Sequence, residues 1–329
     1  MNSLNLDINS PIKVLISCLF FKNYTGSEMY IYELSKELIK LNCDVTVLSD
    51  INGPLSQEAR KHGIKTIQLP NFPGYKIGDG QWGFKTPNGI VKSQPNNLYK
   101  ISNVEFDIIH TQHKPITEQI INLYPDIPKL STIHSEVINL EDPIIDKTIM
   151  EYVAIRPEIK EKMIYNDGVD ESKISVIYNP IDSYRFNTKD IKDDGYILFV
   201  GTIDYLREQS IRDIIKYAKE QGKELWLVGE NHSNYLHELL TNPHVKHFKS
   251  TNQVEKYVKN CSETAGILLG RTTIEGWMCG KPGWIYEIDN NGNIKNKERF
   301  DIPSDIHKFD SKNVAKQIKE LYIKILKEW

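Results

Sequence analysis

The stretch LLGRTTIEGWMCGKPGWIYEID, residues 268–289, combines residue types that suit the binding of an anion. The preceding run AGILLG predicts a strand that ends near Gly270. Gly270 and Arg271 are expected to turn the chain, and a helix is expected to begin at Thr272 and Thr273, because threonine is a frequent N-cap residue. The free N–H groups at a helix start attract phosphate, and arginine offers it forked donors. The stretch is either an ordinary strand-to-helix connection or the floor of a phosphate site.

Glu275 is expected in the first turn of this helix, where a carboxylate stabilises the helix dipole. The residue type leaves two roles open, a plain helix-start carboxylate and an acceptor for a ligand. A P-loop is excluded by spacing, because Gly276 and Gly280 are one residue too close and Pro282 stands where a Ser or Thr would hold magnesium.

Histidines at two predicted strand ends are further candidates. His134 lies in STIHSE and is either a structural histidine or a ligand-contacting one, with Glu136 close enough in sequence to orient it. His110 and His113 form an HxxH pair, but zinc would need more ligands of the right type nearby. No Asp-x-Asp follows a predicted strand to offer a pair of carboxylates to a divalent ion, so we expect no metal.

Gly26 and Ser27 follow the first predicted strand and open the first predicted helix. Glycine there serves a tight turn, and it also lets a phosphate or an acceptor hydroxyl approach the backbone. The helix carries a mixed charged face rather than a basic membrane-binding one, which disfavours a partner in a membrane. The charged residues of this face are Glu28, Glu33, Lys36, Glu37 and Lys40.

The bulk composition predicts a soluble cytoplasmic protein. The net charge is −3 and 26% of residues are charged, which argues against broad attraction to nucleic acid or anionic membranes. Four cysteines stand far apart without a CxxC pair, so reduced thiols are expected. The start MNSLNLDINS lacks the order of a secretion signal, and the apolar run VLISCLFF is too short to span a bilayer.

Strand-like and helix-like runs alternate along the chain, which predicts an α/β protein with parallel sheets covered by helices. The order restarts at GYILFVG, so we expect two Rossmann-like doubly wound domains, residues 1–183 and 184–311. The last helix, within 312–329, has an apolar face and is expected to pack back on the first domain.

The glycine- and proline-rich stretch at residues 69–97 interrupts this alternation and predicts a long irregular loop. Its aromatic residues Tyr75, Trp82 and Phe84 either stack on a sugar or base or anchor the loop.

The C-terminal stretch resembles the donor site of retaining glycosyltransferases of the GT-B fold, in the large family 4 group. Glu275, Gly280, Lys281 and Pro282 match the family pattern. The resemblance extends along almost the whole chain. Further matching segments are YTGSEMYIYELSKELIKLNCDVTVLSD, FDIIHTQH, LSTIHSE, ISVIYNPIDSYRF and ILFVGTIDYLREQSI.

This resemblance implies an acceptor-side first domain and a donor-binding second domain that face a cleft. It implies transfer of a sugar from a nucleotide diphosphate, with UDP favoured, to a hydroxyl acceptor, with retention and without metal or other cofactor. The implied catalytic residues are His134, Arg207 and Glu275. The implied donor-binding residues are Gly26, Ser27, Gly201, Gly270, Arg271, Thr272, Thr273 and Glu275, with Glu275 accepting from the ribose. The implied acceptor residues are Trp82, His113 and Glu136.

Three positions depart from the family pattern. Ile267 replaces the first glutamate of the usual pair, which contacts the transferred sugar, and Thr202 replaces an arginine after the second-domain glycine. Arg207 stands at the position of the lysine that holds the diphosphate. We hypothesise that Arg271 supplies the missing basic contact.

Other functions remain open at this stage. A sugar-nucleotide epimerase and a non-catalytic nucleotide-sugar binder fit the same scaffold. A phosphorylase would need a cofactor-binding lysine motif that is not evident, and a Rossmann dehydrogenase is disfavoured because no GxGxxG follows a leading strand. The acceptor is undetermined: a glycan, a lipid-linked sugar, a small molecule, a protein or a modified nucleobase are all compatible.

Overall fold

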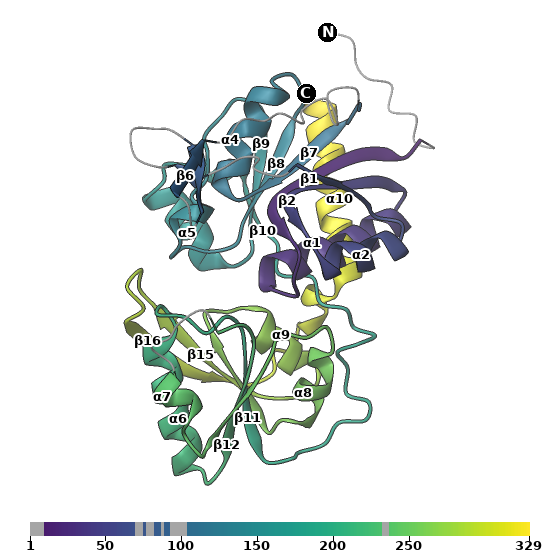
Figure 1. Cartoon of the computed structure of the whole chain (residues 1–329). Helices are drawn as coiled ribbons and strands as arrows, with labels where there is room; N and C mark the ends of the chain where they lie inside the picture. Colours follow the sequence, from purple (N-terminus) through teal and green to yellow (C-terminus); the bar gives the residue numbers. More distant parts are fainter. Residues whose placement is uncertain (1–9, 70–74, 77–81, 87–88, 93–103, 232–236) are drawn as a thin grey trace. The chain divides into compact units, whose positions relative to one another are not determined.

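The computed structural model describes residues 10–69, 75–76, 82–86, 89–92, 104–231 and 237–329. The chain forms two compact units (Figure 1). Unit 1 comprises Met1–Asn23, Tyr30–Tyr178 and Val314–Trp329, and unit 2 comprises Tyr24–Met29 and Asn179–Asn313. Apart from Tyr24–Met29, the chain enters unit 2 at Asn179 and returns to unit 1 at Val314.

Unit 1 contains a seven-stranded sheet in the order β10-β9-β8-β7-β1-β2-β3, with every neighbouring pair parallel. Its strands are β1 Ile12–Phe21, β2 Cys43–Asn52, β3 Lys65–Gln68, β7 Ile108–Gln112, β8 Lys129–Ile133, β9 Ile149–Ala154 and β10 Ile174–Val176. β1 is buried along nearly its whole length, as its continuous apolar sequence predicts for a strand covered on both faces.

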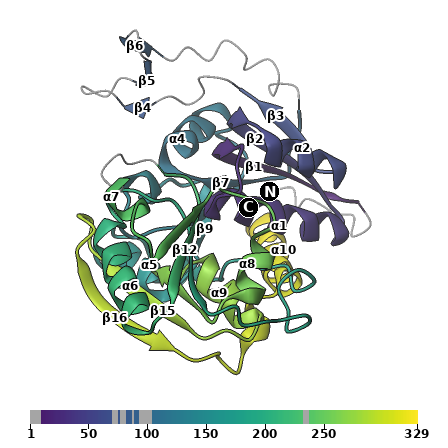
Figure 2. The same ribbon diagram turned by 60° about the horizontal axis from the view of Figure 1, so that its bottom comes forward.

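Helices cover both faces of this sheet (Figures 1 and 2). One face carries α1 (Gly26–Lys40), α2 (Pro54–Lys61) and the C-terminal helix α10 (Ser311–Glu328). The other carries α4 (Lys114–Leu123) and α5 (Pro157–Tyr165). The apolar face of α10 is buried, and residues 314–329 belong to unit 1.

Unit 2 contains a six-stranded sheet in the order β13-β12-β11-β14-β15-β16. Its strands are β11 Tyr196–Val200, β12 Glu224–Val228, β13 Val245–Phe248, β14 Glu263–Ile267, β15 Gly283–Ile288 and β16 Ile294–Phe300. The first five strands run parallel, and β16 is antiparallel to β15. Together the two sheets confirm the predicted α/β class with two doubly wound domains.

The helices of unit 2 also divide between two faces (Figures 1 and 2). α6 (Glu208–Glu220) and α7 (His237–Leu240) cover one face, and α8 (Val254–Asn260) and α9 (Arg271–Met278) cover the other. α6 packs its isoleucines against the sheet in a core that includes Leu225, Leu227 and Phe199. It ends before Gly222, whose φ of +65° favours glycine.

One expectation about secondary structure was wrong. The stretch at 69–97 is not irregular throughout, because β4 (Tyr75–Lys76), β5 (Trp82–Thr86) and β6 (Gly89–Lys92) form a three-stranded antiparallel sheet. The side chains of this sheet, including that of Trp82, lie outside the described residues.

The three glutamates of the charged face of α1 are buried. Glu28, Glu33 and Glu37 are 3%, 1% and 7% exposed. Lys36 pairs with Glu33 at 3.1 Å and Lys40 with Glu37 at 2.7 Å, so lysines one turn later compensate the buried carboxylates.

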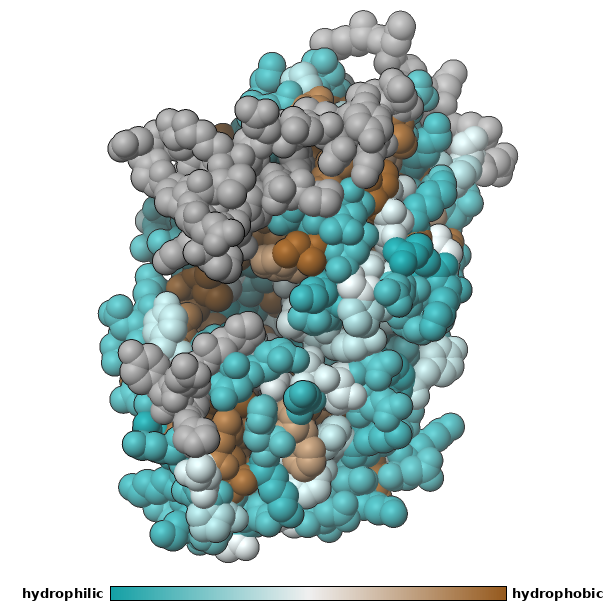
Figure 3. All heavy atoms as spheres, in the orientation of Figure 1, coloured by the Kyte–Doolittle hydropathy of each residue, from teal (hydrophilic) through white to brown (hydrophobic). Residues whose placement is uncertain are grey.

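On the face drawn in Figure 3 the described surface is largely polar, with apolar residues in separate patches. Within the part of the chain that the structure describes, no helix is long and apolar enough to cross a membrane.

Candidate donor site

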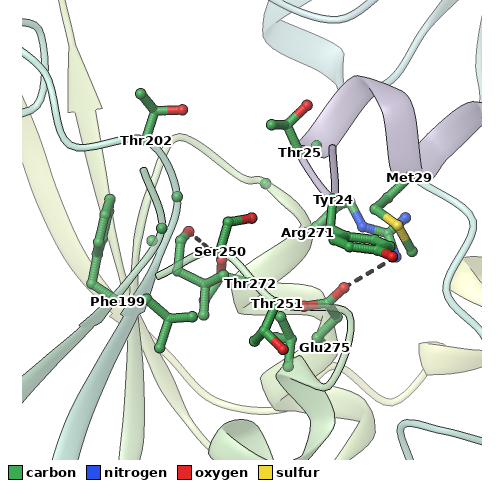
Figure 4. A pocket seen from close by; sticks show the side chains of 18 of the residues that line it. Tyr24, Thr25, Met29, Phe199, Thr202, Ser250, Thr251, Arg271, Thr272 and Glu275 are labelled. Carbon is green, nitrogen blue, oxygen red and sulfur yellow. Dashed lines mark hydrogen bonds and ion pairs between the residues drawn. The ribbon is translucent and has the colours of Figure 1, made fainter. Parts of the chain in front are cut away.

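The carboxyl ends of three neighbouring strands of unit 2 form the floor of a pocket (Figure 4). Phe199 and Gly201 lie at the end of β11, Gly229 follows β12, and Gly266 and Ile267 end β14. Strand carboxyl ends are the usual ligand position in doubly wound sheets. The structure therefore places Gly201 in the same cavity as Ile267, the residue that replaces the first glutamate of the family pattern.

Glycine is required at two of these strand ends by close packing. A Cβ on Gly229 would lie 1.9 Å from the carbonyl oxygen of Gly201, so the backbones after β11 and β12 nearly touch. A Cβ on Gly266 would lie 2.2 Å from Oγ1 of Thr273, so the start of α9 rests directly on β14. Gly229 was missed by the sequence analysis, although it follows its strand as Gly201 follows β11.

α9 begins one residue earlier than the threonine pattern predicts. Gly270 is the N-cap, and Arg271 is the first residue of the helix. Thr272 instead donates its hydroxyl to the carbonyl of Val200 at 2.8 Å, and Thr273 is fully buried beside Gly266. The expected N-cap role of these threonines was wrong, because their side chains fasten the helix to the sheet.

The start of α9 presents backbone donors at the pocket. The first backbone hydrogen bond of the helix runs from Ile274 N to Gly270 O, so the N–H groups of residues 271–273 precede it. The loop before the helix is shaped by Leu268, whose φ of +61° is unusual for a branched side chain. Gly270 and Thr272 line the pocket with Arg271.

Glu275 is the fifth residue of α9 rather than a first-turn residue, and it is 5% exposed. Its Oε1 lies 3.0 Å from Nη2 of Arg271. Figure 4 marks this contact with a dashed line. The angle of this contact is poor for a hydrogen bond, so the contact is an ion pair. Arg271 Nη1 also donates to the carbonyl of Pro180 at 2.7 Å. Arg271 thus has a carboxylate and a carbonyl as partners, where the sequence suggested a phosphate.

Arg207 lines the same pocket at the N-cap of α6. Its side chain is 27% exposed and forms an ion pair with Asp204 three residues earlier. It is the more accessible of the two arginines, because the side chain of Arg271 is only 9% exposed.

Another wall of the pocket is a loop that the sequence analysis did not identify. Ser250, Thr251 and Asn252 line it, together with Glu230 after β12. Arg185 holds this loop, because its guanidinium pairs with Glu255 at 2.6 Å and donates to the carbonyl of Asn252. Only the position of the loop after a strand end could have marked it in advance.

The short segment Tyr24–Met29, which groups with unit 2, completes the lining. Gly26 is among the lining residues and begins α1, whereas Ser27 is not in the lining. An added Cβ on Gly26 would meet nothing within 4 Å, so its neighbours do not require glycine there. The absence of a side chain at Gly26 leaves open space at the edge of the pocket.

The predicted histidines lie in unit 1 and are described there by themselves. His134 contacts Gln112 Oε1 through Nε2 at 2.6 Å and packs edge-on against Tyr30. Its backbone N–H donates to Glu141 at 3.3 Å. Burial holds the pKa of His134 well below its usual value, with the nearby imidazoles of His113 and His110 acting in the same direction. A neutral ring with a proton on Nε2 fits these contacts.

Glu141 connects His134 with His113, and it was missed by the sequence analysis. His113 Nε2 lies 3.4 Å from Glu141 Oε1. Burial raises the pKa of Glu141 to about 7 and lowers that of His113 to about 4. The expected orienting residue, Glu136, instead pairs with Arg156.

His110 is fully buried between Thr132 and Tyr322, with ring-nitrogen contacts of 2.6 Å and 2.7 Å. Both ring nitrogens are engaged, so the HxxH pair does not present two ligands to a metal. Among the described residues no group of three or more His, Cys, Asp or Glu side chains is placed to hold a metal ion.

Known proteins share this fold. Residues 24–185 match the model of Glycosyltransferase Family 4. The structure is similar to that of HepE from Anabaena in complex with UDP and glucose, with a TM-score of 0.65 and 14% identity over 95% of this chain and 100% of that one.

It is equally similar to a glycosyltransferase from Rickettsia africae, with a TM-score of 0.65 and 15% identity over 97% and 100% of the two chains. Sucrose-phosphate synthase from Thermosynechococcus elongatus gives a TM-score of 0.63 and 12% identity over 97% and 100%. A search of curated proteins found no match. The chain has the fold of the GT-B glycosyltransferases, and residues 24–185 resemble Glycosyltransferase Family 4.

Proposed function

We propose that the protein transfers a sugar from a nucleotide-diphosphate donor, with UDP favoured, to a hydroxyl acceptor. The observation that carries this proposal is the composition of one pocket in unit 2. The first turn of α9, the strand-end residue Gly201, Arg207 and Glu275 all line it. Structures of the Anabaena protein HepE in complex with UDP and with UDP-glucose support UDP as the nucleotide.

The chemistry to be accelerated is breakage of the bond between the anomeric carbon and the diphosphate. Charge develops on the leaving diphosphate, and fixed donors aimed at that charge lower the barrier. Arg207 and the amides at the start of α9 are proposed to supply these donors, and Glu275 to accept from the ribose. His134 is proposed to contact the transferred sugar, as the family resemblance implies.

Retention of configuration and independence from metal are parts of the same proposal. Both come from the family resemblance, and each has a direct test. The anomeric configuration of the product, followed by proton NMR during turnover, should equal that of the donor. Turnover should be unchanged by EDTA, and dependence on an added divalent ion would contradict the metal-free mechanism.

The first experiment is calorimetric titration of the protein with UDP, GDP and ADP and with their sugar conjugates. Preference for one diphosphate, weakened in Glu275→Ala, is the expected result. Binding of none of them would overturn the proposed donor site.

Two rival functions need separate controls. Release of UDP only in the presence of an acceptor supports a transferase over an epimerase. Slow hydrolysis of the donor without acceptor argues against a non-catalytic binder.

A further inference from the structure

Arg271 occupies a position at which a basic residue does not help the helix. It is the first residue of α9, at the positive end of the helix dipole, where a cation is unfavourable. Its i,i+4 pair with Glu275 has the base before the acid, the less stabilising order. Local helix energetics therefore do not explain an arginine here, and departures from local preference are expected at functional positions.

The surroundings of Arg271 hold the guanidinium in one orientation. Nη1 donates to the carbonyl of Pro180 and Nη2 lies 3.0 Å from Glu275 Oε1. The carbonyl is itself on a fixed segment, because the next residue, Ile181, exchanges backbone hydrogen bonds with Phe309 and Ser311. Because the guanidinium is planar, the hydrogen bond of Nη1 to a fixed carbonyl also fixes the position of Nη2.

We infer that Arg271 is a positioning residue that orients the carboxylate of Glu275 for the ribose and thereby makes the site selective for ribonucleotides over deoxyribonucleotides. This inference rests on the proposed nucleotide-diphosphate site. It assigns Arg271 to the ribose end of the ligand rather than to the diphosphate.

Two observations favour this role over phosphate binding. The side chains of Arg271 and Glu275 are 9% and 7% exposed, so the pair is nearly buried. Moving Arg271 onto a phosphate would separate its guanidinium from the carboxylate of Glu275, and breaking a buried ion pair is strongly unfavourable. A carboxylate that is held in place before binding also loses less conformational entropy when it accepts a hydrogen bond from a hydroxyl.

The test compares the affinity of the full chain for UDP, 2′-deoxy-UDP and 3′-deoxy-UDP by calorimetry. If the titration with UDP, GDP and ADP shows a preference for another base, the diphosphate of that base and its 2′-deoxy and 3′-deoxy forms are used instead. The wild-type protein is expected to bind UDP about 10-fold or more tightly than at least one deoxy form, the size of one hydrogen bond to a charged group. Arg271→Met should reduce this preference to about 3-fold or less while changing the affinity for that deoxy form little.

Arg271→Lys covers the case in which the methionine variant does not fold. A single ammonium cannot reproduce a fork with two partners, so this variant should also lose most of the preference. Arg212→Met is the matched control, because Arg212 forms an i,i+4 ion pair with Glu208 on α6 and does not line the pocket. The Arg212→Met variant should prefer UDP over the deoxy form by the same factor as the wild-type protein.

Equal loss of affinity for UDP and its deoxy forms in both Arg271 variants, with the preference intact, would place Arg271 on the diphosphate and overturn the inference. A wild-type protein that binds UDP and both deoxy forms equally would also overturn it, while leaving the donor site standing. Failure of the wild type to bind any nucleoside diphosphate would instead refute the proposed function.

Discussion

Arg271 and Glu275 face each other across one turn of α9, with guanidinium Nη2 3.0 Å from carboxylate Oε1, and both side chains are almost completely buried. The pair lies in the lining of the pocket at the ends of β11, β12 and β14. A carboxylate in this setting is held in place by its neighbour before any ligand arrives. The pair makes the ribose end of the proposed ligand the most defined part of the site.

Replacing Glu275 by alanine should weaken binding of the nucleoside diphosphate by about 1–3 kcal/mol, because the carboxylate is proposed to accept from the ribose hydroxyls. The variant should also lose stability, since the buried Arg271 then lacks its carboxylate. Calorimetry and thermal unfolding measure the two effects. Glu287→Ala, at an exposed position of β15, is the control, and unchanged affinity in Glu275→Ala would remove that residue from the site.

Arg207→Ala should weaken binding of UDP more than binding of uridine itself, because Arg207 is proposed to contact the diphosphate. We expect a loss of about 1.5–3 kcal/mol for UDP, the range for a hydrogen bond to a charged group. Arg212→Ala, which removes an arginine from the exposed part of α6, should leave both affinities unchanged. Equal losses for UDP and uridine would place Arg207 elsewhere in the ligand.

His134→Ala should slow turnover much more than it weakens donor binding, because the ring is proposed to contact the sugar rather than the nucleotide. Gln112→Leu should give a smaller decrease in kcat. The Oε1 atom of Gln112 holds the His134 ring through the Nε2 atom of that ring, and Gln112 has no role of its own in the proposed reaction. Steady-state kinetics and calorimetry separate the two effects. Normal turnover of His134→Ala would end its assignment.

Acidification should destabilise the protein through the buried histidines of unit 1. Burial lowers the pKa of His110 to about 3 and of His113 to about 4, and it lowers that of His134 as well. Below pH 6.5 the unfolded chain therefore binds protons that the folded chain does not, so stability falls as the pH falls.

Glu141 acts in the opposite direction, because its pKa is raised to about 7 and the folded state keeps that proton longer. With three groups against one, the free energy of unfolding should drop on the order of 3 kcal/mol between pH 7 and pH 5. Urea unfolding at several pH values measures it. Glu141→Gln should make the decrease steeper, and a flat profile in both proteins would show that the histidines are not neutral in the folded state.

Gly229→Ala should disrupt the pocket floor, because the new Cβ would lie 1.9 Å from the carbonyl oxygen of Gly201. Backbone has to move to relieve this contact, and we expect a loss of about 1–3 kcal/mol in stability together with weaker donor binding. Gly195→Ala is a useful control, because an added Cβ there meets open space and only the φ of +80° is unfavourable. Equal stability losses in the two variants would contradict the close approach.

The sequence by itself determined the alternation of strands and helices, the two doubly wound sheets and the helix that carries Glu275. These features follow from apolar periodicity and from glycine after strand ends, which are local properties of the chain. It did not determine which side chains meet. Pairing Arg271 with Pro180, Arg185 with Glu255, or His134 with Gln112 joins residues from 22 to 91 positions apart.

The tertiary structure alone decided the burial of the α1 glutamates, the contact of Gly229 with Gly201 and the hydrogen bond of Arg271 to the carbonyl of Pro180. Each is set by elements that pack against one another from distant parts of the chain. The sequence does not show whether a charged residue faces water or a buried counter-ion. The free energy of its charge depends on the local dielectric and on its partners, and both are set only when the chain folds.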